Sequence, residues 1–328
     1  MIVLGIETSC DETSASIIKD GELLTNIVHT QKIHEEYGGV VPELASQEHL
    51  NQIMTVIQAS LLKANLNLSS IDAIAVTYGP GLMGSLLIGL NFAKAMSLSL
   101  NIPFLGVNHL EGHLYSNYID NDNVKFPHLC CLVSGGHTQL WKINDFNNYN
   151  MLGSSIDDAA GEAFDKLSRF CGFGFPCGPA IQRIAESGNP SKINLPRPKT
   201  KHEYNYSFSG LKTAATNFLK NIDPDDKITR ADFAASYQEA IVDSLMINFT
   251  KAVKETGVKN ISGGGGVMAN SRLREKMNIL ANDNNLEIFL PSPRLSTDNA
   301  AMICVAAQND LITNDLKEND VRLSSIIK

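Results

Sequence analysis

The sequence predicts a two-lobed α/β fold in which two similar halves face each other across a central cleft. Three observations predict it. The chain has 328 residues, 43% of them apolar, which is enough for a substantial core and favours two domains over one. Apolar runs of strand length alternate with helical periodicity along the chain. Each half also has a polar loop between two strands and a strand that ends in glycines, and such loops are expected to line a cleft at the carboxyl ends of strands.

We expect the first half to contain, in order, three strands, a helix, a strand, a helix and a strand. Asp20-Gly21 is the turn in a meander whose strands are expected at residues 2–6, 14–19 and 22–28. Pro42 opens a helical pattern that runs to about Ala64. A strand follows at 71–77, and then the loop Gly79-Pro80-Gly81-Leu82-Met83-Gly84. After this loop we expect a buried helix to about residue 100 and a strand at 104–107.

The second half is expected to repeat this order. The polar turn Ser134-Gly135-Gly136-His137-Thr138 joins strands at 129–133 and 139–143, and a further strand is expected near Met151. Helices follow at about 159–170, 179–186, 211–220 and 231–256. The half ends with a strand at 260–262, a glycine run at 263–266, a helix from 269, a strand at 287–290 and a final helix from 297.

These patterns divide the chain into two lobes. We assign residues 1–108 to an N-terminal lobe, which the C-terminal helix at 297–328 completes. Residues 109–296 are assigned to a C-terminal lobe with helical insertions.

The charge balance argues against a broad nucleic-acid-binding face. Against 35 Asp and Glu there are only 27 Lys and Arg, which gives a formal net charge of −8. One strip, Lys192–His202, carries Lys and Arg without an acid. It is either a solvated loop or a local contact for nucleic-acid phosphates, since such contacts need only a few cations.

Cysteine spacing and hydropathy predict a soluble cytoplasmic protein that makes no membrane contact. None of the six cysteines has C-x-x-C spacing, so reduced thiols are expected. The start, Met1–Glu7, lacks the basic segment of a secretion signal. The most apolar stretch, Leu82–Leu100, is interrupted by Asn91 and Lys94 and is typical of a buried helix.

A candidate metal site follows the predicted strand at 104–107, in His109-Leu110-Glu111-Gly112-His113. If this segment is helical, His109 and His113 lie one turn apart on one face, where both imidazoles can reach a single cation. Asp298, at the start of the last predicted helix, is our choice of third ligand, because two imidazoles and a carboxylate leave open positions on the metal. The alternatives are that both histidines are ordinary core or surface residues and that Asp298 caps a helix.

The same segment invites comparison with metalloproteases, in which H-E-x-x-H supplies two ligands and a general base. Here the order is H-x-E-x-H. Glu111 then projects from a different angle of the helix, so peptidase chemistry has weak support.

Three glycine-bearing loops of the second half, at 134–138, 175–179 and 263–270, are candidates for holding a nucleotide. Glycine lets backbone N–H groups approach phosphate or ribose oxygens, and a helix that starts after the loop adds a favourable dipole. Each loop alone is more often a structural turn, and the chain lacks a Walker motif. Asp157 and Asp158 are expected to cap a helix, whereas Asp165, two turns later, is suited to a ribose hydroxyl.

Taken together, these segments resemble the tRNA adenosine threonylcarbamoyltransferases, a family once regarded as glycoproteases. The resemblance covers nearly the whole chain in order and no single segment decides it. The matching segments are Gly5–Thr13, Tyr37–Glu43, Gly79–Gly81, His109–His113, Ser134–Thr138, Asp157–Lys166, Phe208–Thr213, Gly264–Asn270 and Thr297–Asn299.

The resemblance implies a fold and a reaction. The fold is the actin-like, sugar-kinase-like ATPase fold, whose duplicated ribonuclease-H-like halves enclose a cleft. The reaction transfers threonylcarbamoyl from threonylcarbamoyl-AMP to N6 of adenosine 37, in tRNAs that read codons beginning with A, and releases AMP. It further implies two protein partners, a smaller paralogous subunit of the TsaB type and a small ATPase of the TsaE type.

The resemblance also implies site residues. His109, His113 and Asp298 would bind one divalent metal ion, with Fe(II) expected and Zn(II) as the alternative. The substrate would contact Leu132, Val133, Ser134, Gly135, Gly136, Asp165, Gly178 and Asn270. One departure is visible, because Pro176-Cys177-Gly178-Pro179 stands where the family usually has Pro-Gly-Gly-Pro. If the replaced glycine has positive φ, Cys177 is expected to be strained by about 1 kcal/mol or more.

A mixed-anhydride donor requires orientation and charge stabilisation more than a covalent nucleophile. In this mechanism the metal acts as a Lewis acid or template, and glycine-loop N–H groups hold the adenylate. Asp11 and Glu12, two acids in a strand-to-strand loop, are the hypothesised catalytic residues that place or deprotonate the amine. The alternatives are a small-molecule kinase or ATPase of the same fold, a metalloprotease, and a nucleotide-binding scaffold without catalysis.

Overall fold

A computed structural model describes residues 1–119, 121, 123–171, 177–221 and 227–313. The chain divides into two compact units, one formed by residues 1–122 with 298–328 and the other by residues 123–297. The boundary expected after residue 108 therefore lies after residue 122. The reason is long-range packing, because helix α4 (His109–Tyr115) packs against α11 (Ala300–Thr313) and stays with the first unit.

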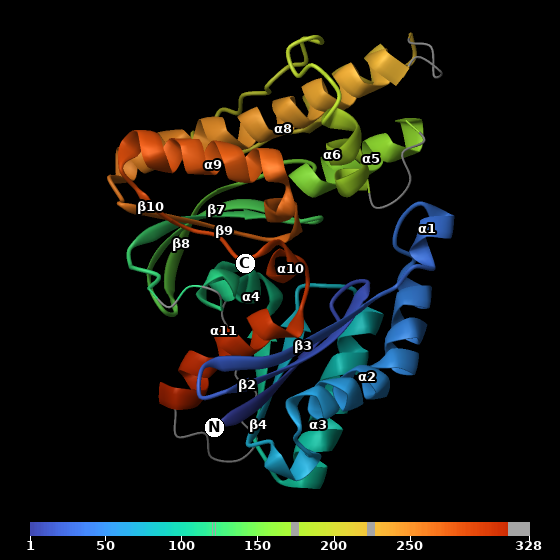
Figure 1. Ribbon diagram of the computed structural model, residues 1–328, viewed down its shortest axis with the longest axis vertical. Helices are drawn as coiled ribbons and strands as arrows, with labels where there is room; N and C mark the ends of the chain where they lie inside the picture. Colours follow the sequence, from blue (N-terminus) through green and yellow to red (C-terminus); the bar gives the residue numbers. More distant parts are fainter. Residues whose placement is uncertain (120, 122, 172–176, 222–226, 314–328) are drawn as a thin grey trace. The chain divides into compact units, whose positions relative to one another are not determined.

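The first unit is built on a five-stranded sheet of order β3-β2-β1-β4-β5 (Figure 1). Its first three strands form an antiparallel meander, and the last two run parallel to β1. The strands are β1 (Ile2–Glu7), β2 (Glu12–Lys19), β3 (Glu22–Thr30), β4 (Ala73–Gly79) and β5 (Phe104–Asn108).

Helices cover both faces of this sheet. Leu4, Ile6 and Ile17 point toward α2 (Pro42–Ala64) and α3 (Met83–Leu100), with which they form one apolar cluster. The alternate residue Gly5 faces α11 so closely that a Cβ would lie 2.5 Å from the Ala300 carbonyl oxygen. This alternation is that of a strand buried on both faces. The short elements are α1 (His34–Tyr37), η1 (Leu68–Ser70) and η2 (Ser116–Tyr118).

The second unit repeats the same sheet. Its order is β10-β9-β6-β7-β8, with an antiparallel meander β6-β7-β8 and two strands parallel to β6. The two sheets have the same strand order, so the predicted duplicated α/β architecture is confirmed. The strands are β6 (His128–Val133), β7 (Thr138–Asp145), β8 (Asn148–Ser154), β9 (Asn260–Gly264) and β10 (Glu287–Phe289).

The longest helix of the second unit, α8 (Lys227–Thr256), supplies the centre of its core. An apolar side chain recurs at every fourth position, and all five are almost fully buried, at Phe233, Tyr237, Ile241, Leu245 and Phe249. This stripe packs one helix face against its neighbours. The other helices are α5 (Ala160–Cys171), α6 (Cys177–Ala185), α7 (Ser209–Leu219), η3 (Gly266–Ala269), α9 (Ser271–Asn284) and α10 (Pro293–Ser296).

Helix α3 is the one described helix that is long and apolar enough to cross a membrane, with a mean hydropathy of 1.3. It packs on α2 and β4, and Leu86, Gly89 and Ala93 lie on its buried face. Such a helix is also typical of a protein core. The sequence predicts a buried helix, but α3 is buried on one face only, since Met83 and Leu98 are more than 70% exposed.

Candidate functional site

The strand-to-helix junction at residue 108 positions both histidines of the candidate metal site. Strand β5 ends at Asn108, whose side-chain oxygen accepts a hydrogen bond from the Leu110 N–H at 2.8 Å and so caps α4. His109 and His113 follow on the first two turns, and both are buried. Their rings meet edge to face, with centroids 4.7 Å apart.

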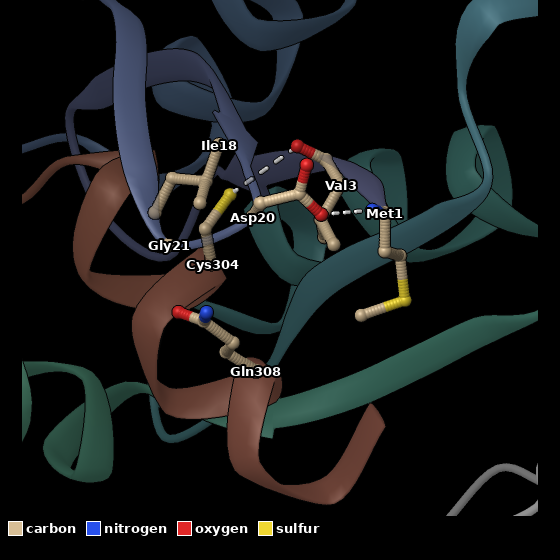
Figure 2. A pocket seen from close by; sticks show the side chains of 7 residues that line it. All are labelled: Met1, Val3, Ile18, Asp20, Gly21, Cys304 and Gln308. Atoms are coloured by element: carbon tan, nitrogen blue, oxygen red, sulfur yellow. Dashed lines mark hydrogen bonds and ion pairs between the residues drawn. The ribbon is translucent and has the colours of Figure 1, made fainter. Parts of the chain in front are cut away.

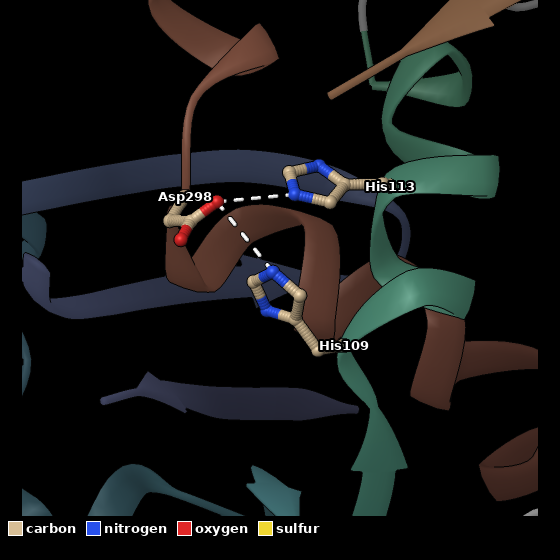
Figure 3. A group of neighbouring side chains, drawn as sticks. All are labelled: His109, His113 and Asp298. Carbon is tan, nitrogen blue, oxygen red and sulfur yellow. Dashed lines mark hydrogen bonds and ion pairs between the residues drawn. The ribbon is translucent and has the colours of Figure 1, made fainter. Parts of the chain in front are cut away.

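Asp298 joins these histidines from the other end of the first unit's sequence (Figure 3). Its Oδ1 lies 3.1 Å from His113 Nε2 and 3.6 Å from His109 Nε2. The cap of α11 is the neighbouring Asn299, whose Oδ1 accepts from the N–H groups of Ala301 and Met302. The helix-cap alternative for Asp298 is therefore wrong, and its carboxylate faces the imidazoles.

A buried carboxylate, Glu7, orients the first histidine. Its side chain is fully buried at the end of β1, and Oε2 lies 3.1 Å from His109 Nδ1. Glu7 also accepts hydrogen bonds from the Ser9 N–H and the Thr77 hydroxyl. With Nδ1–H directed to Glu7, His109 presents Nε2 to the side where Asp298 lies, the usual arrangement behind a metal-binding histidine.

The charges of the cluster are coupled. Burial disfavours a charged His109, but Asp298 and Glu7 outweigh burial and raise the pKa of His109 to about 9. Burial, together with the charge of His109, lowers the pKa of His113. For Glu7, burial alone would raise the pKa, yet attraction to His109 lowers it. Without a metal, His109 is thus held in its protonated form, with Nδ1–H toward Glu7 and Nε2–H toward Asp298.

The donor set fits a divalent transition metal. One atom from each of His109, His113 and Asp298 lies within 4.8 Å of the other two. Two imidazole nitrogens and a carboxylate oxygen, with further positions open, suit Fe(II) or Zn(II) better than Mg²⁺ or Ca²⁺. A bound cation would replace the proton on Nε2 of His109, which faces Asp298.

Gly81 in the loop before α3 and Gly89 within α3 let this loop and helix pack closely against the two residues that follow Glu7. A Cβ on Gly81 would lie 2.6 Å from the Ser9 carbonyl oxygen, and one on Gly89 would lie 2.4 Å from Thr8 Oγ1. The Leu82 N–H donates to the Ser9 carbonyl at 2.8 Å. The glycine motif at 79–84 therefore serves close packing against the segment that follows Glu7.

Asp11, the last residue before β2, and Glu12, the first residue of β2, are both half-buried. Burial, then the charges of Asp11 and Asp298, raise the pKa of Glu12 well above its ordinary value. Glu12 and Asp11 also share a side-chain hydrogen bond. Glu12 is thus within electrostatic range of Asp298, and its charged form is disfavoured.

In the second unit, glycines surround the backbone of the turn after β6. A Cβ on Gly265, where φ is +89°, would lie 2.3 Å from the Val133 carbonyl oxygen, and one on Gly161 would lie 2.5 Å from that of Ser134. The turn is closed by a bond from the Ser134 N–H to the His137 carbonyl at 2.8 Å. By contrast, a Cβ on Gly135 would meet nothing within 4 Å. Gly135 is therefore open on the side where a Cβ would stand, although its Cα lies close to Gly161.

Of the other expected substrate residues, two already have structural partners. Asp165 Oδ1 accepts from the Cys177 N–H at 2.9 Å, at the start of α6. Asn270 Oδ1 accepts from the Leu273 N–H and caps α9, and its amide nitrogen donates to Gln238 at 2.8 Å. Leu132 belongs to β6 and is fully buried.

The strain expected at Cys177 is not found, because Cys177 is the first residue of helix α6 and helical backbone has negative φ. Its thiol is buried. A Cβ on the neighbouring Gly178 would meet nothing within 4 Å. The preceding residues of this loop, 175 and 176, lie outside the described residues.

A separate pocket of about 270 Å³ lies beside the N-terminus (Figure 2). Its lining includes Met1, whose ammonium group pairs with Asp20, and Cys304, whose pKa burial raises to about 12. A thiol with so high a pKa is a poor nucleophile. No residue expected for metal or substrate binding lines this pocket.

Comparison with known proteins gives a consistent result. The model of the family described as tRNA N6-adenosine threonylcarbamoyltransferase matches residues 22–305, a range that includes His109, His113 and Asp298. A curated relative of that name from Caldicellulosiruptor saccharolyticus is 46% identical over 333 residues, covering 100% of this chain and 99% of its own length. Another, from Clostridioides difficile, is 47% identical over 330 residues and covers 99% and 97%.

Solved structures with little sequence identity share the fold. HypF of T. kodakarensis has a TM-score of 0.62 at 13% identity, over 95% of this chain and 48% of that one. Component A of (R)-2-hydroxyglutaryl-CoA dehydratase from Acidaminococcus fermentans has a TM-score of 0.55 at 15% identity, over 95% and 100%. Both are of the actin-like, sugar-kinase-like type, which confirms the predicted fold class.

Proposed function

This chain belongs to the tRNA N6-adenosine threonylcarbamoyltransferase family, and from that premise we propose that it transfers threonylcarbamoyl from threonylcarbamoyl-AMP to N6 of adenosine 37 in tRNA. The tRNAs would be those that read codons beginning with A. The end-to-end similarity to curated transferases carries the proposal, because it spans all of this chain and nearly all of the relative. The chain is accordingly an enzyme of the transferase class.

We propose that His109, His113 and Asp298 hold one divalent cation, Fe(II) first and Zn(II) as the alternative. The convergence of three ligand atoms beside a fully buried Glu7 supports this. When bound, the cation supplies Lewis-acid stabilisation of negative charge on the donor. The task of Glu7 is to keep the His109 Nδ1–H directed away from the cation.

The chain's own backbone would hold the adenylate. At Gly135 and Gly178 a Cβ would meet no atom within 4 Å, which supports close approach of a ligand to the main chain there. N–H groups at such glycines stabilise phosphate oxygens, whose charge grows as the anhydride breaks. The substrate set proposed from the sequence, residues 132–136 with Asp165, Gly178 and Asn270, lies entirely within the second unit.

The transfer needs an acceptor for one proton. The N6 nitrogen forms a bond to the carbamoyl carbon, the bond from that carbon to the phosphate oxygen breaks, and N6 loses a proton. We assign the proton to the carboxylate of Asp11, which shares a side-chain hydrogen bond with Glu12. Glu12, whose pKa is raised by burial and by the charge of Asp11, would orient Asp11 through that bond.

We further propose a cytoplasmic enzyme that works with the smaller paralogous subunit and the small ATPase. An acidic chain with a net charge of −8 gains from partners when it must hold tRNA. Exposed apolar side chains in the middle of α2 and at the start of α3 support a protein partner there. They are Leu50 and Met54 on α2, and Met83 and Leu87 on α3.

The test of this function is mass spectrometry of tRNA nucleosides. Unmodified tRNA is incubated with the purified chain, threonylcarbamoyl-AMP and the two partner proteins. Threonylcarbamoyladenosine at position 37 is expected only in tRNAs that read codons beginning with A. Incubation with ATP and candidate sugars in place of the donor tests the kinase alternative, and a phosphorylated sugar with unchanged tRNA would refute the proposal.

A further inference from the structure

One buried histidine of α2 forms hydrogen bonds with the segment that carries Asp11 and Glu12. We call residues Cys10–Thr13, which end the turn after β1 and include the first two residues of β2, the acidic loop. His49 is fully buried, with Nε2 at 2.9 Å from the Cys10 carbonyl oxygen and Nδ1 at 2.8 Å from Thr13 Oγ1. One imidazole thus bonds to both ends of a four-residue segment whose two middle residues are the acids.

The chemistry of these two bonds fixes the form of the ring. A carbonyl oxygen only accepts hydrogen bonds, so His49 Nε2 carries the hydrogen and Nδ1 accepts from the Thr13 hydroxyl. Burial lowers the pKa of His49, which keeps the ring in this neutral form at physiological pH. Both nitrogens are satisfied, as a buried polar ring requires.

Gln31 fastens the middle of the acidic loop to the same helix. Its N–H donates to the Asp11 carbonyl at 3.0 Å, and its side-chain amide donates to the Ala45 carbonyl on α2 at 3.1 Å. The backbone on both sides of the two carboxyl groups is therefore tied to α2, while Asp11 and Glu12 themselves are only half-buried.

We propose that His49 is a positioning residue for the transfer, which sets the place of Asp11 and Glu12 by holding Cys10 and Thr13. The inference rests on the proposed function, in which Asp11 accepts the amine proton. His49 itself contacts neither the metal ligands nor a substrate residue through any of its hydrogen bonds. Its effect reaches the reaction only through the backbone of the acidic loop.

The same helix offers a matched control for a merely structural role. Thr25 on β3 and Ser60 on α2 also share a buried hydroxyl hydrogen bond, at 2.6 Å. Like the bond between Thr13 and His49, it ties the sheet to α2. Thr25 lies on a strand without any expected site residue, so its loss weakens the same contact without moving the acidic loop.

The experiment compares Thr13→Val, Thr13→Ser, His49→Phe and Thr25→Val with the wild type. Steady-state kcat, KM for donor and tRNA, bound metal and thermal stability are measured for each. We expect Thr13→Val and His49→Phe to lower kcat on the order of 10- to 100-fold, as for a misplaced catalytic group, with both KM values and the metal content unchanged. Thr13→Ser retains the hydroxyl and should restore kcat, and Thr25→Val should keep kcat within about twofold.

Two outcomes would overturn the inference. One is wild-type kcat in Thr13→Val and His49→Phe while Asp11→Asn is inactive. The acids would then be placed correctly without the hydrogen bonds of His49. The other is an equal loss of kcat in Thr13→Val and Thr25→Val that follows their loss of stability. Failure of the proposed function is distinguishable, because the wild-type chain itself would then leave tRNA unmodified.

Discussion

At the scale of single residues, the candidate site depends on what each carboxylate is free to do. Asn299 caps α11, so Asp298 can face His109 and His113. Glu7 accepts hydrogen bonds from Ser9 and Thr77, and its remaining contact is with one nitrogen of His109, Nδ1. The sequence shows the histidine pair because its spacing is local. The role of Glu7 cannot be predicted from the sequence, because it depends on contacts with Thr77 and His109, which are distant in the chain. The one available signal is that Glu7 is an acid at the end of an apolar strand.

Removal of one imidazole should remove the metal. We expect His109→Ala to lose stoichiometric metal and transfer activity together, because two ligands hold a cation much more weakly than three. Elemental analysis of the purified variant measures the metal. The matched control is His128→Phe, which replaces another buried histidine, one bonded to Ser262 in the second unit. Full metal occupancy in His109→Ala would rule out the assignment.

Metal affinity should rise with pH. The pKa of His109 is raised to about 9, so below that pH the metal-free chain carries a proton that the cation must displace. The pKa of His113 is lowered from 6.5, so this ring is already neutral at pH 7 and adds no further proton. Between pH 6.5 and 8.5 we expect an affinity gain of about tenfold per pH unit, measured by competition with a chelator. A flat profile in this range would contradict the coupled charges described here.

At the scale of elements, the predictable part of the fold is the part with local signals. Apolar runs and the Asp20-Gly21 turn located the first meander, and Pro42 marked the start of α2. Helix α1 was missed because four residues carry no periodicity. The glycine motifs were recognised as loops, but the atoms that require glycine, such as the Val133 carbonyl opposite Gly265, lie far away in the sequence.

Two glycines of the second unit should respond differently to alanine. Gly265→Ala should lower the free energy of unfolding by more than about 2 kcal/mol, because φ is +89° and the Cβ would lie 2.3 Å from the Val133 carbonyl oxygen. Gly135→Ala should change it by less than about 0.5 kcal/mol but weaken donor binding, because its Cβ would stand where a ligand approaches. Denaturant unfolding and donor titration measure the two effects. Equal stability loss in both variants would contradict this distinction.

At the scale of the whole molecule, the two units repeat one strand order, which alternating patterns in both halves had indicated. The unit boundary could not be predicted, because it depends on the packing of α4 against α11 across nearly the full sequence. Partner surfaces are even harder to predict from the sequence than the unit boundary, because the exposed apolar residues of α2 and α3 follow the same periodicity as the buried ones. Only the exposed fraction in the structure, 63% for Leu50 and 2% for Ile53, separates these two residues.

The exposed apolar residues of α2 and α3 should form a partner surface. A Cβ on Gly84 would lie 3.1 Å from the Ser46 Cβ, so α2 and α3 begin side by side, and each carries exposed apolar side chains. We expect Leu50→Glu to weaken binding of the smaller paralogous subunit at least about tenfold. Binding would remove the water around the new carboxylate, which costs free energy. Analytical ultracentrifugation measures this. Ile279→Glu, a similarly exposed site on α9, is the control, and equal binding by both variants would argue against this surface.

The central claim is that transfer to tRNA requires the cation held by His109, His113 and Asp298. The most direct measurement titrates Fe(II) into metal-free protein, with its partners, donor and tRNA present, and counts threonylcarbamoyladenosine formed in a single turnover. The account predicts that product rises in proportion to bound metal and reaches its plateau at one ion per chain. Transfer by the metal-free protein at the rate of the loaded protein would contradict it.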